Sequence, residues 1–193
     1  MFEYIKGELA DLTPTSAIIE NNSIGYFIHI SLNTYSQLSG HKTVQLYLHQ
    51  VVREDAHMLY GFIDTREREI FRHLISVSGV GVNTARVMLS SLSPVEIQTA
   101  ILSNNAKTLQ GVKGIGAKSA QRIIIELKDK LGKESEILEI SLPQDNTNKE
   151  EALSALVMLG FAKNAAYKVV DKIYTANPTS SVEDLIKLAL KQL

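Results

Sequence analysis

Two nearly identical glycine turns lie in the middle of the chain. Ser78-Gly79-Val80-Gly81 and Lys113-Gly114-Ile115-Gly116 are offset by 35 residues, and a stretch with helical periodicity follows each of them. Glycine enters positive φ without steric cost, so each turn is predicted to be a tight hairpin between two helices. The apolar residue between the glycines is predicted to anchor the hairpin in the core.

The residues around these turns predict contact with phosphate groups. Uncovered amides at the start of a helix favour an anion, and successive amides in a tight turn form a concave nest for it. A single Gly-x-Gly could simply end a helix, but the repeat includes matching apolar flanks, Leu74 and Ala85 in one copy and Leu109 and Ala120 in the other. The pair therefore indicates a tandem helix-hairpin-helix domain that grips the backbone of a DNA duplex rather than its bases.

The basic residues are concentrated around the same turns. The 193-residue chain has a formal net charge of −1, but residues 65–133 hold 11 basic and 5 acidic side chains. Residues 1–64 hold 3 basic and 7 acidic side chains, and residues 134–193 hold 6 and 9. This distribution favours one phosphate-binding segment between acidic neighbours, although solvated helix faces could give the same bias.

The composition is that of an ordinary globular protein, with 45% hydrophobic residues and no cysteine. The lack of cysteine excludes a disulfide framework and a thiolate metal site. The N-terminus has no signal-peptide pattern and no apolar run reaches membrane-spanning length, so a soluble, cytoplasmic protein without membrane contact is expected. The five histidines lie singly, and no metal or cofactor is predicted.

The residue pattern predicts an α+β chain that begins with a barrel. Residues 1–64 contain five short stretches rich in β-branched and aromatic residues, which predict a five-stranded OB-fold β-barrel. The strands are expected at 2–9, 16–20, 26–30, 44–52 and 57–62, with a turn at Asn21-Asn22-Ser23. Residues 65–132 have helical periodicity and carry both hairpins, so an all-α domain is expected there, with Ser93-Pro94 at the start of one helix.

The remaining residues predict a linker and a small helical module. Residues 133–149 are polar, contain proline and lack an apolar period, which is typical of a flexible linker. Residues 150–193 are predicted to form a three-helix (UBA-like) module with helices at 150–159, 163–174 and 181–190. Ser181 and Asp184 have the spacing of a capping box at the start of the last helix.

The second glycine turn is a near match to a nucleotide-binding P-loop. A P-loop follows a strand and has lysine directly after its last glycine, whereas Ala117 separates Gly116 from Lys118 and the preceding residues have a helical pattern. A glycosylase built on such a hairpin would carry a catalytic aspartate beyond it, and no matching motif follows either turn. We therefore expect no nucleotide site and no catalytic residue.

Glu54 and Asp55 form an acidic tip between two predicted strands. A solvated hairpin is the simplest interpretation of such a tip, and as catalytic carboxylates the two residues would lack a visible third metal ligand. A structure-specific nuclease or glycosylase that uses them stays an alternative hypothesis. A generic duplex-binding adaptor that uses only the hairpins is another.

Several of these features together resemble the RuvA family of Holliday-junction-binding subunits. The resemblance rests on the two hairpins, on residues 51–62 around the acidic tip, and on Ala155-Leu156-Val157-Met158-Leu159-Gly160-Phe161, and it runs nearly end to end. It implies a non-catalytic subunit that binds four-way junction DNA as a homotetramer and holds the junction open and planar. It also implies recruitment of a RuvB-type hexameric ATPase for branch migration in recombination, DNA repair and the SOS response. One or two tetramers per junction, and contact with a junction-resolving nuclease, are left open.

The resemblance further implies roles for individual residues. Glu54 and Asp55 of four copies would meet at the centre of the junction and keep its strands apart. Family members often have Pro-Lys after the first Gly-Val-Gly, where this chain has Val82-Asn83-Thr84, so Arg86 is a candidate to replace the missing cation. The motor would dock on Leu156, Leu159 and Phe161, unless these form the module's own core. The implied DNA contacts are Gly79, Gly81, Asn83, Thr84, Arg86, Gly114, Gly116, Lys118, Ser119 and Arg122.

Overall fold

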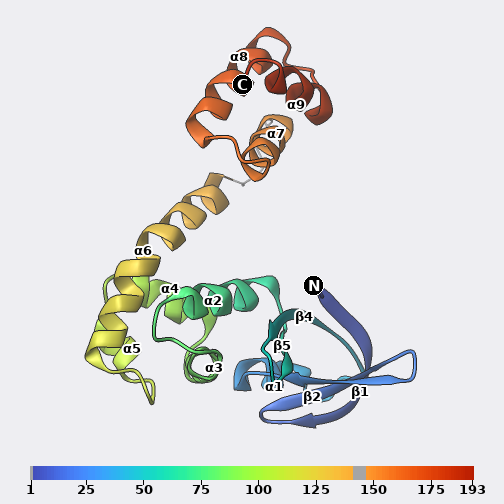
Figure 1. Ribbon diagram of the computed structural model, residues 1–193, viewed down its shortest axis with the longest axis vertical. Helices are drawn as coiled ribbons and strands as arrows, with labels where there is room; N and C mark the ends of the chain where they lie inside the picture. Colours follow the sequence, from blue (N-terminus) through green and yellow to red (C-terminus); the bar gives the residue numbers. More distant parts are fainter. Residues whose placement is uncertain (1, 141–146) are drawn as a thin grey trace. The chain divides into compact units, whose positions relative to one another are not determined.

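The computed structural model describes residues 2–140 and 147–193. The chain divides into two compact units, Met1–Ser135 and Glu136–Leu193, which are coloured blue to yellow and yellow to red in Figure 1.

The first unit begins with a closed barrel. Its described residues form five strands in the order β1-β2-β3-β5-β4, in which β3 and β5 run parallel and the other neighbours antiparallel. This topology confirms the predicted OB-fold, and positive φ angles at Asn22 and Ser23 confirm the predicted turn. The strands are β1 (Tyr4–Thr13), β2 (Ser16–Asn21), β3 (Ile24–His29), β4 (Thr43–Val52) and β5 (His57–Phe62).

A short helix that the sequence pattern did not predict connects β3 to β4. Helix α1 (Leu32–Leu38) begins at Ser31, whose hydroxyl accepts a hydrogen bond from the Thr34 N–H at 3.0 Å. With seven residues it makes about two turns, too few for an apolar period to stand out. Its side chains at Thr34 and Leu38 are buried.

The rest of the first unit is helical, as predicted. Ser93 and Glu96 form a complete capping box with Pro94 in the first turn, which confirms the predicted helix start. The helices are α2 (Thr65–Ser76), α3 (Val82–Ser91), α4 (Pro94–Leu102), α5 (Ala106–Gln110) and α6 (Ala117–Ile140).

The barrel and the helices share one hydrophobic core. Phe71 of α2 lies 5.3 Å from Tyr60 and 4.9 Å from Phe62, measured between ring centroids, and all three side chains are almost completely buried. Aromatic pairs at this separation add about 0.5–1.5 kcal/mol each beyond the area that they bury. Residues 1–64 and 65–132, predicted as separate domains, therefore lie in one compact unit.

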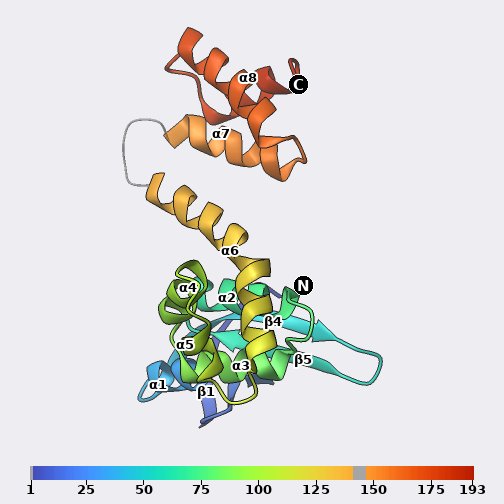
Figure 2. The same ribbon diagram turned by 90° about the vertical axis from the view of Figure 1, so that its left-hand side faces the viewer.

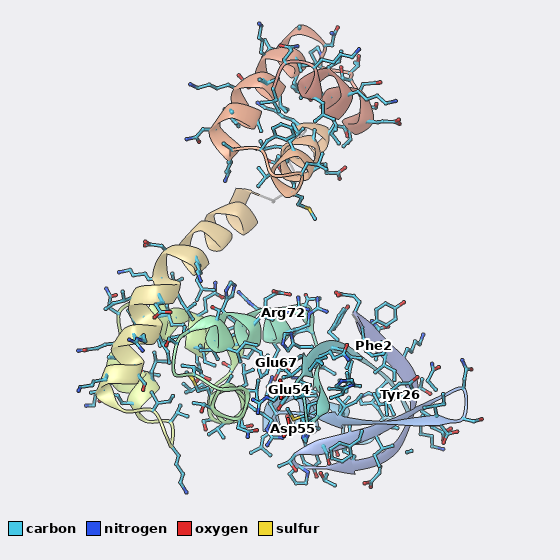
Figure 3. The ribbon with its side chains drawn as sticks, in the orientation of Figure 1. Phe2, Tyr26, Glu54, Asp55, Glu67 and Arg72 are labelled. Atoms are coloured by element: carbon cyan, nitrogen blue, oxygen red, sulfur yellow. The ribbon has the colours of Figure 1, made fainter. Side chains whose placement is uncertain are left out.

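A buried carboxylate reinforces this junction. Glu67, in the first turn of α2, accepts hydrogen bonds from the Ser31 hydroxyl at 2.5 Å and the Thr34 hydroxyl at 2.6 Å. The Ile63 N–H lies 3.3 Å from the second carboxylate oxygen. Because Glu67 is completely buried, its carboxylate oxygens depend on these protein donors for their hydrogen bonds. Figure 3 labels Glu67 where α2 meets the barrel.

Arg68, the next residue of α2, holds the start of β1. Its guanidinium lies 2.6 Å from the Glu3 carboxylate and also donates to the Glu3 carbonyl at 2.9 Å. The hydrogen bond and charge of Arg68 lower the pKa of Glu3. The first turns of α2 therefore contact the barrel through two successive charged side chains.

The second unit contains the predicted three-helix module. In its described residues α7 (Thr147–Met158), α8 (Lys163–Ala176) and α9 (Val182–Leu190) pack around a small core. Ser181 caps α9 by accepting from the Asp184 N–H at 3.2 Å, and its hydroxyl donates to the Asp184 carboxylate at 2.7 Å. The observed cap thus uses a side chain to side chain bond where a capping box uses the backbone N–H.

The segment predicted as a linker is shorter than residues 133–149. Helix α6 continues to Ile140 and α7 begins at Thr147, because the backbone keeps helical hydrogen bonds even where the apolar period is lost. Residues 141–146 lie outside the described residues, and the flexibility of the segment stays a prediction.

We predict that Glu67→Ala loosens the contact between barrel and helices. The Ser31 and Thr34 hydroxyls would lose their acceptor, and an unsatisfied buried polar group costs about 1–3 kcal/mol. Hydrogen-exchange mass spectrometry on the whole chain should show faster exchange in peptides from α1 and α2. The control is Glu126→Ala on α6, an exposed carboxylate expected to change stability by less than about 0.5 kcal/mol. Equal exchange in both variants would contradict the bridging role of Glu67.

Candidate nucleic-acid interface

The first glycine turn connects α2 to α3 in a tight hairpin. The Val80 N–H donates to the Val77 carbonyl at 3.0 Å, and both side chains are buried. Gly79 has a φ of +90°, which a residue with a Cβ rarely adopts. Gly81 is the N-cap of α3, and no side chain among the described residues caps this helix. The amides of its first turn are therefore open to an external acceptor.

The second turn repeats this geometry between α5 and α6. The Ile115 N–H donates to the Val112 carbonyl at 3.0 Å, and Gly114 has a φ of +92°. Gly116 directly precedes α6. Helix α5, rather than a strand, comes before this turn, unlike the context of a P-loop. The two turns are structural copies, as the sequence repeat predicts.

The glycines leave open space in front of the backbone. A Cβ built on Gly79, Gly81, Gly114 or Gly116 would meet no atom of the described residues within 4 Å. Gly79 and Gly114 need glycine for their positive φ, but Gly81 has an ordinary φ of −83°. Nothing in the described packing requires glycine at that position, so the small residue leaves room for a group from outside the chain.

One side chain joins the two hairpins. The Arg122 guanidinium, on α6, donates to the carbonyl of Ser78 in the first hairpin at 3.3 Å. Its Nε lies 3.6 Å from the Glu126 carboxylate, and the side chain stays more than half exposed. The two hairpins are therefore neighbours in space, and Arg122 lies between them.

The structure places most of the other predicted contact residues on the same surface region. Asn83 and Lys118 are exposed, and Thr84 and Ser119 are half-buried, each in the first turn of α3 or α6. A shallow depression beside the second hairpin is lined by Lys118, Gln121, Arg122, Ile125 and Glu126. Helix starts, polar groups and two cations thus surround the glycine turns.

Arg86 does not join this group. It lies on α3, but its guanidinium contacts the barrel, 3.4 Å from the Thr15 carbonyl and 3.3 Å from Nδ1 of His29. The expectation that Arg86 replaces the missing lysine of the first hairpin is not supported by this placement. The sequence gives no signal for the contact, because its partners lie 71 and 57 residues away along the chain.

Glu54 and Asp55 lie at the exposed tip of the β4–β5 hairpin. The Arg53 N–H donates to the Ala56 carbonyl at 2.8 Å and closes the turn around them. Figure 2 shows this hairpin extending away from the helices of its unit, and Figure 3 labels both carboxylates. Within residues 2–140 and 147–193, no group of three or more His, Asp or Glu side chains could hold a metal ion.

The module's three candidate docking residues separate into core and surface. Leu156 is completely buried and Phe161 packs against the same core. Gly160 has a φ of +100°. The Phe161 N–H donates to the Leu156 carbonyl, and the Gly160 N–H donates to the Val157 carbonyl. Together these features form a Schellman motif at the end of α7. Leu156 is thus part of the module's own core, the alternative that the sequence pattern left open, and a docking role for it stays a prediction.

The same motif leaves an apolar surface at the end of α7. Leu159 is 62% exposed and Met158 is 86% exposed, and Val157 beside them is partly exposed. Met158 is not among the docking residues predicted from the sequence, although it lies next to Leu159 in the quoted motif. Elsewhere in the chain, no described helix combines the length and apolar character that would let it cross a membrane.

Three family models match successive parts of the chain. "RuvA N terminal domain" matches residues 1–61, "SAM-like Helix-hairpin-helix tandem" matches residues 71–129, and "RuvA, C-terminal domain" matches residues 147–193. The first two therefore cover the barrel and the hairpins, and the third covers the module.

Full-length relatives are similar over their whole length. The chain is 54% identical over 193 residues to a protein of Christiangramia forsetii. It is 49% identical over 193 residues to a protein of Flavobacterium psychrophilum and 50% identical over 204 residues to a protein of Bacteroides fragilis. Each comparison covers 100% of this chain and 100% of the relative. Each relative is named Holliday junction branch migration complex subunit RuvA. With matches to both terminal domains of one family and such relatives along its full length, the chain belongs to the RuvA family.

Proposed function

We propose that this chain is a non-catalytic subunit that binds four-way DNA junctions as a homotetramer. It holds the junction open and planar and recruits a hexameric ATPase motor for branch migration in recombination and repair. The observation that carries the proposal is the pair of open glycine hairpins in the same compact unit as an exposed acidic tip. The names of the relatives support the choice of a Holliday junction as the DNA substrate.

The hairpins supply the grip on each arm of the junction. The open amides after Gly81 and Gly116 face an anion with the positive ends of α3 and α6 behind them. Two hairpins joined by Arg122 fit two nearby phosphates of one duplex. Lys118 adds an exposed cation, and Asn83 and Thr84 add hydrogen-bond donors. Such contacts position a duplex without reading its sequence.

The acidic tip supplies the repulsive element. In a fourfold assembly Glu54 and Asp55 give eight carboxylates near the axis. Two like charges about 4 Å apart repel by about 1–4 kcal/mol, depending on the effective dielectric constant. Phosphates that approach this centre are repelled while the arms are held outside it. The strands at the crossover would stay apart without any bond being cut.

The exposed end of α7 supplies the contact with the motor. Met158 and Leu159 present apolar surface on a module with a small core, and such surface commonly marks a partner site.

The docking contact is tested by Leu159→Ser, which should reduce the stimulation of the motor ATPase by the chain. The control is Leu190→Ser at an exposed leucine on α9, which should leave the stimulation unchanged. Equal stimulation by both variants would move the docking site elsewhere.

The grip is tested by placing a methyl group in front of the amides. Gly81→Ala and Gly116→Ala should fold, with stability changed by less than about 1 kcal/mol at the helix start. The wild type should prefer a four-way junction over linear duplex in gel-shift competition at one stated salt concentration. Each variant should bind the junction about tenfold or more weakly, because a hydrogen bond to a charged group is worth about 1.5–3 kcal/mol.

Gly132→Ala is the matched control, since a Cβ there meets only the Leu102 side chain, at 4.0 Å, away from the hairpins. It should bind the junction as the wild type does. Equal wild-type affinity for junction and duplex would contradict the proposed function. Unchanged junction affinity in both hairpin variants would show that the amides are not the contact.

The tip is tested by removing its charge. The double substitution Glu54→Gln and Asp55→Asn should leave junction affinity unchanged or raise it, because the repulsion of phosphates is lost. It should also reduce strand opening, measured by the fluorescence of 2-aminopurine at the crossover. Incubation of the wild type with labelled junction and Mg²⁺ is expected to leave the strands intact. Weaker junction binding by the double variant would contradict the repulsive role.

A further inference from the structure

Arg86 binds the barrel from the helix that begins at the first hairpin. Its Nη1 lies 3.4 Å from the Thr15 carbonyl and 3.3 Å from Nδ1 of His29. Arginine only donates hydrogen bonds, so Nδ1 of His29 is the acceptor and the ring is neutral. Burial, followed by the nearby charge of Arg86, lowers the pKa of His29, which is consistent with this neutral form.

Ser90 makes a second contact one helical turn later. The Leu32 N–H, at the start of α1, donates to the Ser90 hydroxyl at 3.1 Å, and this hydroxyl donates to the Arg86 carbonyl at 2.8 Å. Residues four apart lie on the same face of a helix. Helix α3 is therefore held to the barrel and to the start of α1 by two successive turns of one face, directly after the open amides that follow Gly81.

His29, a barrel residue that Arg86 contacts, lies beside the strand that follows the acidic tip. His29 pairs with Tyr60 of β5 in the parallel register, and their ring centroids lie 5.3 Å apart. Strand β5 starts at His57, immediately after the turn that carries Glu54 and Asp55. Arg86, His29 and Tyr60 thus form a continuous series of contacts from the first hairpin's helix to the strand that supports the tip.

We propose that Arg86 is a positioning residue that fixes the first hairpin relative to the acidic tip and does not contact phosphate. The proposal deepens the function proposed above and depends on it. The Nη1 group is occupied by two barrel acceptors and the side chain is half-buried, whereas Lys118 is exposed beside the second hairpin. Loss of Arg86 should leave each grip intact but allow it to shift against the tip.

The test separates a phosphate contact from a positioning contact by salt dependence. For each phosphate contact removed, the slope of log K against log salt falls by about 0.9. Lys118→Gln should lower this slope for the four-way junction, and Arg86→Gln should leave it at the wild-type value. Arg86→Gln should instead lower the 2-aminopurine signal at the crossover under saturating protein. A lower slope in Arg86→Gln, or an unchanged 2-aminopurine signal, would overturn the proposal.

Two further measurements keep the test decisive. In the free protein, the pKa of His29 measured by NMR should rise in Arg86→Gln, and an unchanged value would overturn the contact itself. Ser90→Ala removes only the second contact and should also lower the 2-aminopurine signal. This variant still tests the proposal if Arg86→Gln fails to fold. If the wild type neither prefers the four-way junction over linear duplex nor opens it, the proposed function itself is refuted. Failure of the Arg86 proposal is therefore distinguishable from failure of the proposed function.

Discussion

The packing of α2 against the barrel determines how the functional parts are arranged. Phe71 stacks on Tyr60 and contacts Phe62, and Glu67 accepts hydrogen bonds from two hydroxyls at the start of α1. Full burial of one such aromatic side chain is worth about 1.5–3 kcal/mol. This contact makes the barrel and the hairpin domain one compact unit. The acidic tip and the glycine hairpins are consequently held in one geometry instead of moving as separate domains.

The proposed function assigns the attraction and the repulsion of DNA phosphates to different parts of this unit. The hairpins offer backbone amides and a few cations, whereas the tip offers two negatively charged carboxylates. The chain therefore does not need a large net charge to bind DNA. In the proposed assembly, discrimination between a four-way junction and a linear duplex arises from the positions of four grips around an acidic centre, because each hairpin alone recognises only phosphate backbone.

Local sequence signals predicted most of the fold and part of the site. The glycine turns, the Ser93 cap and the five strands depend on residues close together in the chain, so their patterns could be recognised directly. The Glu67 cluster and the Arg86 contact join residues 33 or more positions apart, and no periodicity encodes such pairs. Leu156 and Leu159 lie in one apolar motif, and only the packing of α7 against α8 and α9 shows that the first is buried and the second exposed.

The most direct test of the fourfold arrangement is the native mass of the chain with and without a synthetic four-way junction. Four chains should be found with one junction, because one hairpin domain then binds each arm. Eight chains should be found if two tetramers enclose the junction, with one hairpin domain for each arm on each face. Linear duplex of the same arm length should not produce that stoichiometry. A single chain or a dimer bound to the junction would contradict the central claim that selectivity comes from four grips around an acidic centre.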